Sequence, residues 1–115
     1  MTLESIFEQL GGDYHETKER LMSDELILRM LKKFSADQEY SKLEQAMKAK
    51  DLETAFRAAH TLKGIALNLG LGNLAKSAVD LTESLRYGKT DFTEELFEQC
   101  KEEYRKTISI LEQLK

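Results

Sequence analysis

Apolar side chains recur at intervals of three and four positions along most of the chain, which is the spacing of one face of an α-helix. Near the N-terminus this pattern predicts a short helix over residues 3–10, with Thr2 as its N-cap and the Gly11-Gly12 pair as its stop. A weaker pattern over residues 14–22 also favours a helix, and a boundary near Ser23 precedes a clear amphipathic stripe. The N-terminal third of the chain therefore predicts short helices.

The middle of the chain carries the longest patterns. A predicted helix over residues 40–50 is followed by Asp51, which offers an N-cap for a helix over residues 52–69. Gly70 closes that helix, and the same apolar spacing resumes over residues 71–85. Because the connection between them is so short, these two helices should form an antiparallel hairpin.

A last helix is predicted after Gly88. Asp91 and Glu94 stand at the spacing of a capping box, so we expect the helix to begin there. Its buried face should consist of Phe97, Cys100, Tyr104, Ile108 and Leu111.

The predicted elements define an all-α fold, an antiparallel four-helix bundle with additional short N-terminal helices. The chain has 115 residues and no proline, which suits a single domain built from uninterrupted helices. Within that domain, residues 1–36 form the N-terminal helices and residues 37–115 form the bundle. The hairpin over residues 51–87 lies inside the bundle.

Charge and composition narrow the function classes. The net charge is −4, with a charged fraction of 33% and a hydrophobic fraction of 41%, which fits a folded globular domain and argues against a nucleic-acid partner. No apolar run could cross a bilayer, and the start of the chain lacks the basic residues of a signal peptide, so we expect a cytoplasmic protein without a membrane partner. The single cysteine, Cys100, has no cysteine partner for a disulfide or a zinc site and is expected in the core.

One glycine does not fit the helix boundaries. Gly64 falls in the middle of the predicted helix over residues 52–69, where glycine costs about 0.5–1 kcal/mol relative to alanine. At about 100° per residue, His60, Gly64 and Asn68 share one face, with Arg57 on the same side. The imidazole should therefore be exposed beside a gap without side chains. Composition alone favours an incidental surface histidine and a tolerated packing glycine.

The sequence around His60 favours a functional histidine over an incidental one. Residues 57–71 read RAAHTLKGIALNLGL. This segment resembles the signature of the histidine-containing phosphotransfer (HPt) domain, in which a histidine is followed by leucine, lysine and glycine and then by a leucine-glycine pair. The resemblance covers most of the chain and is weakest in the N-terminal helices. Beyond the signature it extends through Leu74, Ala78, Leu81, Glu83 and Arg86.

The resemblance implies a role for the histidine that its chemistry permits. His60 is implied to be the phosphoacceptor, since a neutral imidazole has an unprotonated nitrogen near pH 7 that can attack a phosphoryl group. The family usually reacts through the outer ring nitrogen. Lys63, one turn away, would place a positive charge near the phosphate oxygens, although a solvated lysine is an equally good interpretation.

The hairpin geometry adds two residues to the expected surroundings of the phosphate. Thr82 should reach the height of His60 on the adjacent helix, at a position where many family members have a glutamine that hydrogen-bonds the histidine. Threonine is shorter, so a bridging water could replace a direct contact. Arg86, one turn further on, could meet the partner or the phosphate, or serve the helix dipole alone.

The resemblance further implies a phosphorelay carrier rather than an enzyme. Its partners would be the receiver domain of a response regulator, a histidine kinase, or both. The receiver would supply magnesium, and this chain would bind no cofactor. We expect a monomer, and the start of the chain, Met1 followed by a capped helix, favours a free-standing protein.

Two other functions remain as alternatives. A helical module could dock a receiver without accepting phosphate, although the joint presence of His60, Lys63 and Gly64 argues against it. A metal or haem protein is a remote alternative, because the two histidines lie far apart and no Glu-x-x-His pair is present. His15 stands among acidic residues without a neighbouring glycine gap and is predicted to be an ordinary surface residue.

Overall fold

The computed structural model describes residues 2–88 and 91–114, and every regular element in that part of the chain is helical. The all-α fold predicted from the sequence is confirmed. The helices are Leu3–Leu10 (α1), Tyr14–Leu21 (α2), Asp24–Ser35 (α3), Glu39–Lys48 (α4), Leu52–Leu69 (α5), Gly72–Arg86 (α6) and Thr93–Leu111 (α7), with a 3₁₀ turn at Glu112–Leu114.

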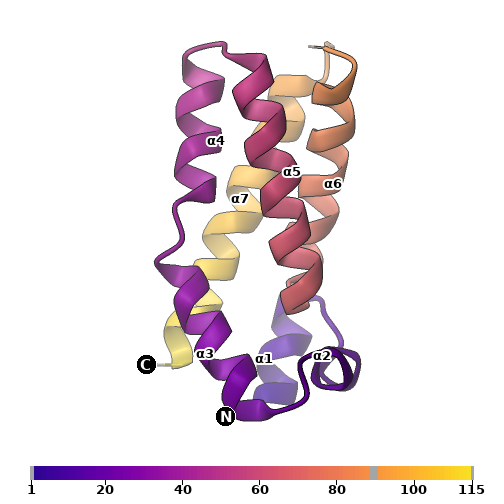
Figure 1. Ribbon diagram of the computed structural model, residues 1–115, viewed down its shortest axis with the longest axis vertical. Helices are drawn as coiled ribbons and strands as arrows, with labels where there is room; N and C mark the ends of the chain where they lie inside the picture. Colours follow the sequence, from indigo (N-terminus) through magenta and orange to yellow (C-terminus); the bar gives the residue numbers. More distant parts are fainter. Residues whose placement is uncertain (1, 89–90, 115) are drawn as a thin grey trace.

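Four helices form an up-and-down bundle. Figure 1 shows α4, α5 and α6 side by side, with successive helices running in opposite directions, and α7 passing behind them. The short helices α1, α2 and α3 gather at the end of the bundle where α5 ends and α6 begins (Figure 1). The predicted antiparallel hairpin is therefore the pair α5 and α6, joined by a turn at Gly70.

Local capping groups explain most helix boundaries. Thr2 and Ser5 form a reciprocal capping box at the start of α1, and Ser23 accepts a hydrogen bond from the backbone of Leu26 in α3. At the start of α5 the Asp51 carboxylate accepts from the side chain and backbone of Thr54, which holds the pKa of that carboxyl below its ordinary value. These starts agree with the sequence prediction.

The start of α7 does not agree. The helix begins at Thr93 with Phe92 as its N-cap residue, without a side-chain cap, so the capping box predicted from Asp91 and Glu94 is wrong. A tertiary contact accounts for the later start. Thr93 is fully buried, and its hydroxyl lies 2.5 Å from the hydroxyl of Ser84 in α6. The buried contact of Thr93 with Ser84 of α6 therefore stabilises the first turn of α7.

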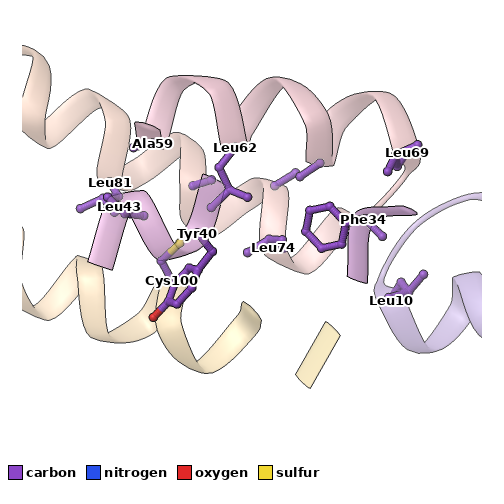
Figure 2. Close-up of a cluster of buried hydrophobic side chains, with 14 of the residues drawn as sticks. Leu10, Phe34, Tyr40, Leu43, Ala59, Leu62, Leu69, Leu74, Leu81 and Cys100 are labelled. Atoms are coloured by element: carbon purple, nitrogen blue, oxygen red, sulfur yellow. The ribbon is translucent and has the colours of Figure 1, made fainter. Parts of the chain in front are cut away.

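The core is built from leucine and alanine, with aromatic rings where α7 meets α3 and α4 (Figure 2). The ring of Tyr40 stacks on Tyr104 with centroids 4.0 Å apart and on Phe97 with centroids 6.5 Å apart. Cys100 is fully buried as predicted, and burial raises the pKa of its thiol to about 11. Of the other residues predicted for the buried face of α7, Leu111 is buried, whereas Phe97, Tyr104 and Ile108 are half-buried.

A backbone contact holds the α1–α2 turn against the α5–α6 turn. A Cβ added to Gly12 would lie 2.0 Å from the carbonyl oxygen of Gly70, and one added to Gly72 would lie 2.0 Å from the carbonyl oxygen of Gly11. We refer to these four residues as the glycine contact. Only glycine lets two turns approach this closely, because any side chain would overlap the opposite backbone. The N-terminal helices are thus fastened directly to the turn that follows α5.

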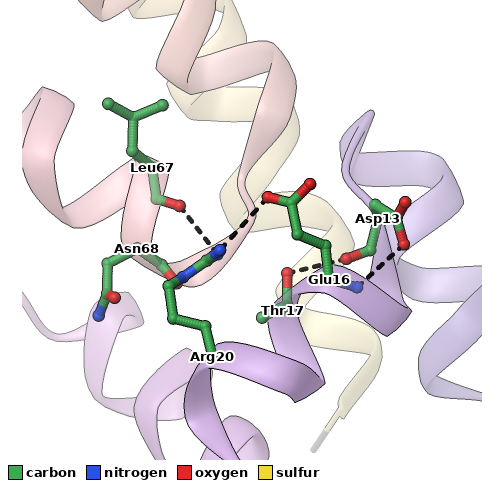
Figure 3. A network of polar contacts seen from close by, with 6 residues as sticks. All are labelled: Asp13, Glu16, Thr17, Arg20, Leu67 and Asn68. Carbon is green, nitrogen blue, oxygen red and sulfur yellow. Dashed lines mark hydrogen bonds and ion pairs between the residues drawn. The ribbon is translucent and has the colours of Figure 1, made fainter.

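A side chain from α2 completes this attachment. Arg20 donates from Nε and Nη2 to the carbonyl of Asn68, at 3.1 and 2.9 Å, and from Nη2 to the carbonyl of Leu67 at 3.1 Å (Figure 3). These carbonyls belong to the last turn of α5, where the regular helical hydrogen bonds end, and that of Leu67 also accepts from the backbone N–H of Gly70 at 3.4 Å. Glu16 lies 3.3 Å from Nη1 of Arg20 and orients the guanidinium. Arg20 therefore caps the C-terminus of the helix that carries His60.

Candidate functional site

His60 lies in the middle of α5 and is exposed. The opposite face of the helix is packed into the bundle through Ala55, Ala59, Leu62 and Ala66, each of which has no exposed surface. Both ends of α5 are fixed, by the Asp51 cap and by the contacts of Arg20. The imidazole therefore stands on a rigid helix and faces solvent, as the helical spacing predicted.

The space beside His60 is open. A Cβ added to Gly64 would meet no heavy atom within 4 Å. The close approach of another part of this chain, which explains the glycine contact, therefore gives no reason for glycine here. The predicted gap is confirmed, and glycine at this position leaves free surface one helical turn from the imidazole.

An aromatic ring borders His60 on the other side along the helix. The rings of Phe56 and His60 are nearly parallel, at 13°, with centroids 6.1 Å apart. The guanidinium carbon of Arg86, from α6, lies 5.2 Å from the centroid of Phe56. Glu83 pairs with Arg86 through two contacts of 3.3 Å. Sequence reasoning placed Phe56 only in the apolar stripe; its spacing of four from His60 is the signal that it missed.

The other polar residues of α5 near His60 differ in their ion-pair and hydrogen-bond partners. Arg57 is exposed and pairs with Glu53 at 3.2 Å. Lys63 is half-buried, and within residues 2–88 and 91–114 no carboxylate pairs with it. Asn68 is exposed, but its backbone carbonyl is engaged by Arg20. Lys63 is thus the cation on α5 whose charge is not already neutralised by a neighbouring carboxylate.

Comparison with family models identifies the fold. The model of the Hpt domain matches residues 27–113, which is most of the chain. The chain belongs to the Hpt domain family. Neither the curated proteins nor the solved structures gave a significant match. Hpt domains act in phosphotransfer of two-component signalling as phosphocarriers rather than as catalysts. The match begins within α3, so α1 and α2 stand outside it.

Thr82 of the Hpt domain lies beneath the surface rather than on it. The residue has no exposed surface, and its hydroxyl donates to the carbonyl of Ala78 at 2.6 Å. We expected Thr82 to be part of the surroundings of the phosphate, and the structure corrects this expectation. The Thr82 hydroxyl forms its hydrogen bond within its own helix. Threonine fits this position because its methyl group continues the buried stripe between Ala78 and Leu85.

The second histidine of the chain, His15, lies outside the matched residues and has different surroundings. His15 lies on α2, with its side chain 79% exposed and its Nε2 3.8 Å from a carboxylate oxygen of Glu4. Its ring meets Tyr14 edge-on, with centroids 5.2 Å apart. Within the described residues, no group of three or more histidine, cysteine or acidic side chains is arranged to hold a metal. Among the same residues, no helix combines the length and apolar character needed to span a bilayer.

Proposed function

We propose that this chain is a phosphorelay carrier that accepts a phosphoryl group on His60 from the aspartyl phosphate of a receiver domain or from a kinase phosphohistidine. The observation that carries the proposal is the exposed imidazole beside the open space at Gly64, on the rigid α5 of an Hpt domain. In the transfer from a receiver, the N–P bond to the imidazole forms as the O–P bond of the acyl phosphate breaks, and the aspartate carboxylate leaves. The reverse step returns the phosphoryl group.

The receiver and this chain contribute different groups to the transfer. The receiver supplies the magnesium ion that neutralises the phosphoryl oxygens, whereas this chain supplies the nucleophile and a nearby positive charge. Lys63 is the best placed cation for that purpose, because Arg57 and Arg86 each pair with a glutamate. The chain is then a substrate of two-component enzymes rather than an enzyme itself, and it works in the cytoplasm, where receivers and kinase domains meet it.

The test is phosphorylation by receiver domains encoded in the same genome, each loaded with labelled phosphate. We expect the label on the Hpt domain to be acid-labile and alkali-stable, as a phosphoramidate is. His60→Gln should fold and accept no label. His15→Gln is the matched control, because it removes the other histidine from an exposed helix, and it should accept label at the normal rate. Label that persists in His60→Gln, or that disappears in His15→Gln, would contradict the assignment.

A further inference from the structure

The ring of Phe56 lies close to two polar groups, the imidazole of His60 on α5 and the guanidinium of Arg86 on α6. Its ring is 13° from parallel with the imidazole, and the guanidinium of Arg86 lies over the same ring at 5.2 Å. We propose that Phe56 is a positioning residue that fixes the orientation of the His60 imidazole and holds the Arg86 guanidinium beside it. The inference rests on the proposed function of His60 and adds a residue to its site.

The first part of the argument concerns the freedom of an exposed imidazole. A histidine on a solvated helix face can change rotamers within nanoseconds, so most of its orientations point the reactive nitrogen away from a docked partner. Parallel-displaced rings with centroids 4.5–7 Å apart attract one another, and the 6.1 Å separation of Phe56 and His60 falls in that range. Stacking therefore raises the population of one orientation. In-line attack on an aspartyl phosphate requires such an orientation.

The second part concerns Arg86. A guanidinium over an aromatic face is held by cation–π attraction, and Glu83 holds the same group by two contacts of 3.3 Å. The side chain of Arg86 is 39% exposed, so this clamp rather than burial keeps it in place. Because the ring of Phe56 contacts both side chains, a phosphoryl group on His60 would offer the guanidinium a second acceptor near the same ring. Phe56 thus keeps a positive charge within reach of the phosphate while Glu83 neutralises it beforehand.

The alternative is that Phe56 only covers part of the core, as any half-buried apolar side chain does. Two substitutions separate these roles. Phe56→Leu keeps an apolar side chain of similar reach but removes the ring, whereas Phe56→Tyr keeps the ring. Phe97→Leu is the matched control, since Phe97 is also half-buried and stacks on Tyr40 in the contact of α4 with α7.

The experiment combines nuclear magnetic resonance with two phosphoryl donors. Loss of the ring current in Phe56→Leu should shift the ring resonances of His60 and the Nε–H resonance of Arg86 by more than Phe97→Leu does. Phosphoramidate, a small donor that needs no docking, should label His60 in Phe56→Leu within about twofold of the normal rate. Transfer from a phosphorylated receiver should be slowed about three- to tenfold in Phe56→Leu and kept within about twofold in Phe56→Tyr and Phe97→Leu.

Each outcome decides a distinct question. Unchanged resonances of His60 in Phe56→Leu, an unchanged rate of receiver transfer in that variant, or equal slowing in Phe56→Tyr would overturn the positioning role. If no receiver transfers phosphate to the unsubstituted chain, the proposed function fails. The resonances of His60 and Arg86 then decide by themselves whether Phe56 orients the two groups.

Discussion

Glycine serves opposite purposes in two regions of this molecule. At the glycine contact, a Cβ on Gly12 or Gly72 would lie 2.0 Å from a carbonyl oxygen of the opposite turn. Beside His60, a Cβ on Gly64 would meet nothing within 4 Å. The same residue type is therefore required by packing in one place and left without a packing reason in the other.

The difference separates the demands of folding from those of function. Backbone entropy makes each glycine unfavourable by about 0.5–1 kcal/mol relative to alanine in a helix. The close approach of two turns gives a packing reason for glycine at position 12, in a turn, and at position 72, at the start of α6, and it joins the α1–α2 turn to the bundle. No contact within the described chain gives such a reason at Gly64. The proposed docking of a receiver close to His60 would supply the missing reason.

The largest expected effect tests the glycine contact. Gly72→Ala places a methyl group against the carbonyl of Gly11, and overpacking of this kind destabilises by about 1–3 kcal/mol or more. We expect a clear drop in the urea midpoint and the melting temperature. The matched control is Gly64→Ala, which makes the identical chemical change in open space. Equal stability of the two variants would show that the turns separate easily and that the comparison has no energetic basis.

A smaller loss is expected when the side-chain attachment beside the same turns is removed. Arg20→Gln removes the hydrogen bonds to the carbonyls of Leu67 and Asn68, and we expect a loss of about 1 kcal/mol. The side chain is 35% exposed, so solvent screening keeps the value below that of a buried charged group. Hydrogen exchange should quicken at the C-terminal end of α5.

Arg29→Gln is the matched control for that measurement. Arg29 pairs with Glu25 four residues earlier, as Arg20 pairs with Glu16, but its side chain is 69% exposed. We expect a change below about 0.5 kcal/mol. If the two variants lose stability equally, the contact with the end of α5 contributes nothing beyond a surface ion pair.

Local features of the fold were predictable from the sequence, and long-range ones were not. Thr2 and Asp51 cap their helices as predicted, and the boundary predicted near Ser23 is a cap as well, because a cap depends on residues within one turn. Arg20 reaches carbonyls 47 and 48 residues away in sequence, and no local pattern indicates such a contact. The start of α7 was misplaced as well, and the contact of Thr93 with Ser84 of α6 at that start is one that no local pattern indicates.

The candidate site shows the same division. Helical periodicity alone placed His60 and Gly64 together on an exposed face of α5, and the structure confirms that placement. The register of the hairpin predicted that Thr82 lies near the level of His60. It did not predict the rotation of α6 that buries Thr82. The contact of Phe56 with Arg86 crosses from α5 to α6, so it required the packed helices as well.

The substitution that is expected to stabilise the chain is the most informative about function. Gly64→Ala should raise the free energy of unfolding by about 0.5–1 kcal/mol, because alanine has the higher helix propensity and meets no neighbour at this position. Transfer between a receiver and His60 should nevertheless become slower, since even a methyl group occupies space that the docked receiver needs. Paired measurements of melting temperature and transfer rate check both expectations on one sample.

A larger side chain sharpens the test. Gly64→Gln should keep the helical circular dichroism spectrum and lose most of the transfer from a receiver, because small misplacements of reacting groups cost large factors in rate. Labelling by phosphoramidate, which requires no docking, should be nearly unaffected and serves as the control for a reactive imidazole. Unimpaired receiver transfer in Gly64→Gln would place the docking surface on another face of α5. The open space at Gly64 would then have no role in phosphotransfer, and the contrast with Gly72 would be one of packing alone.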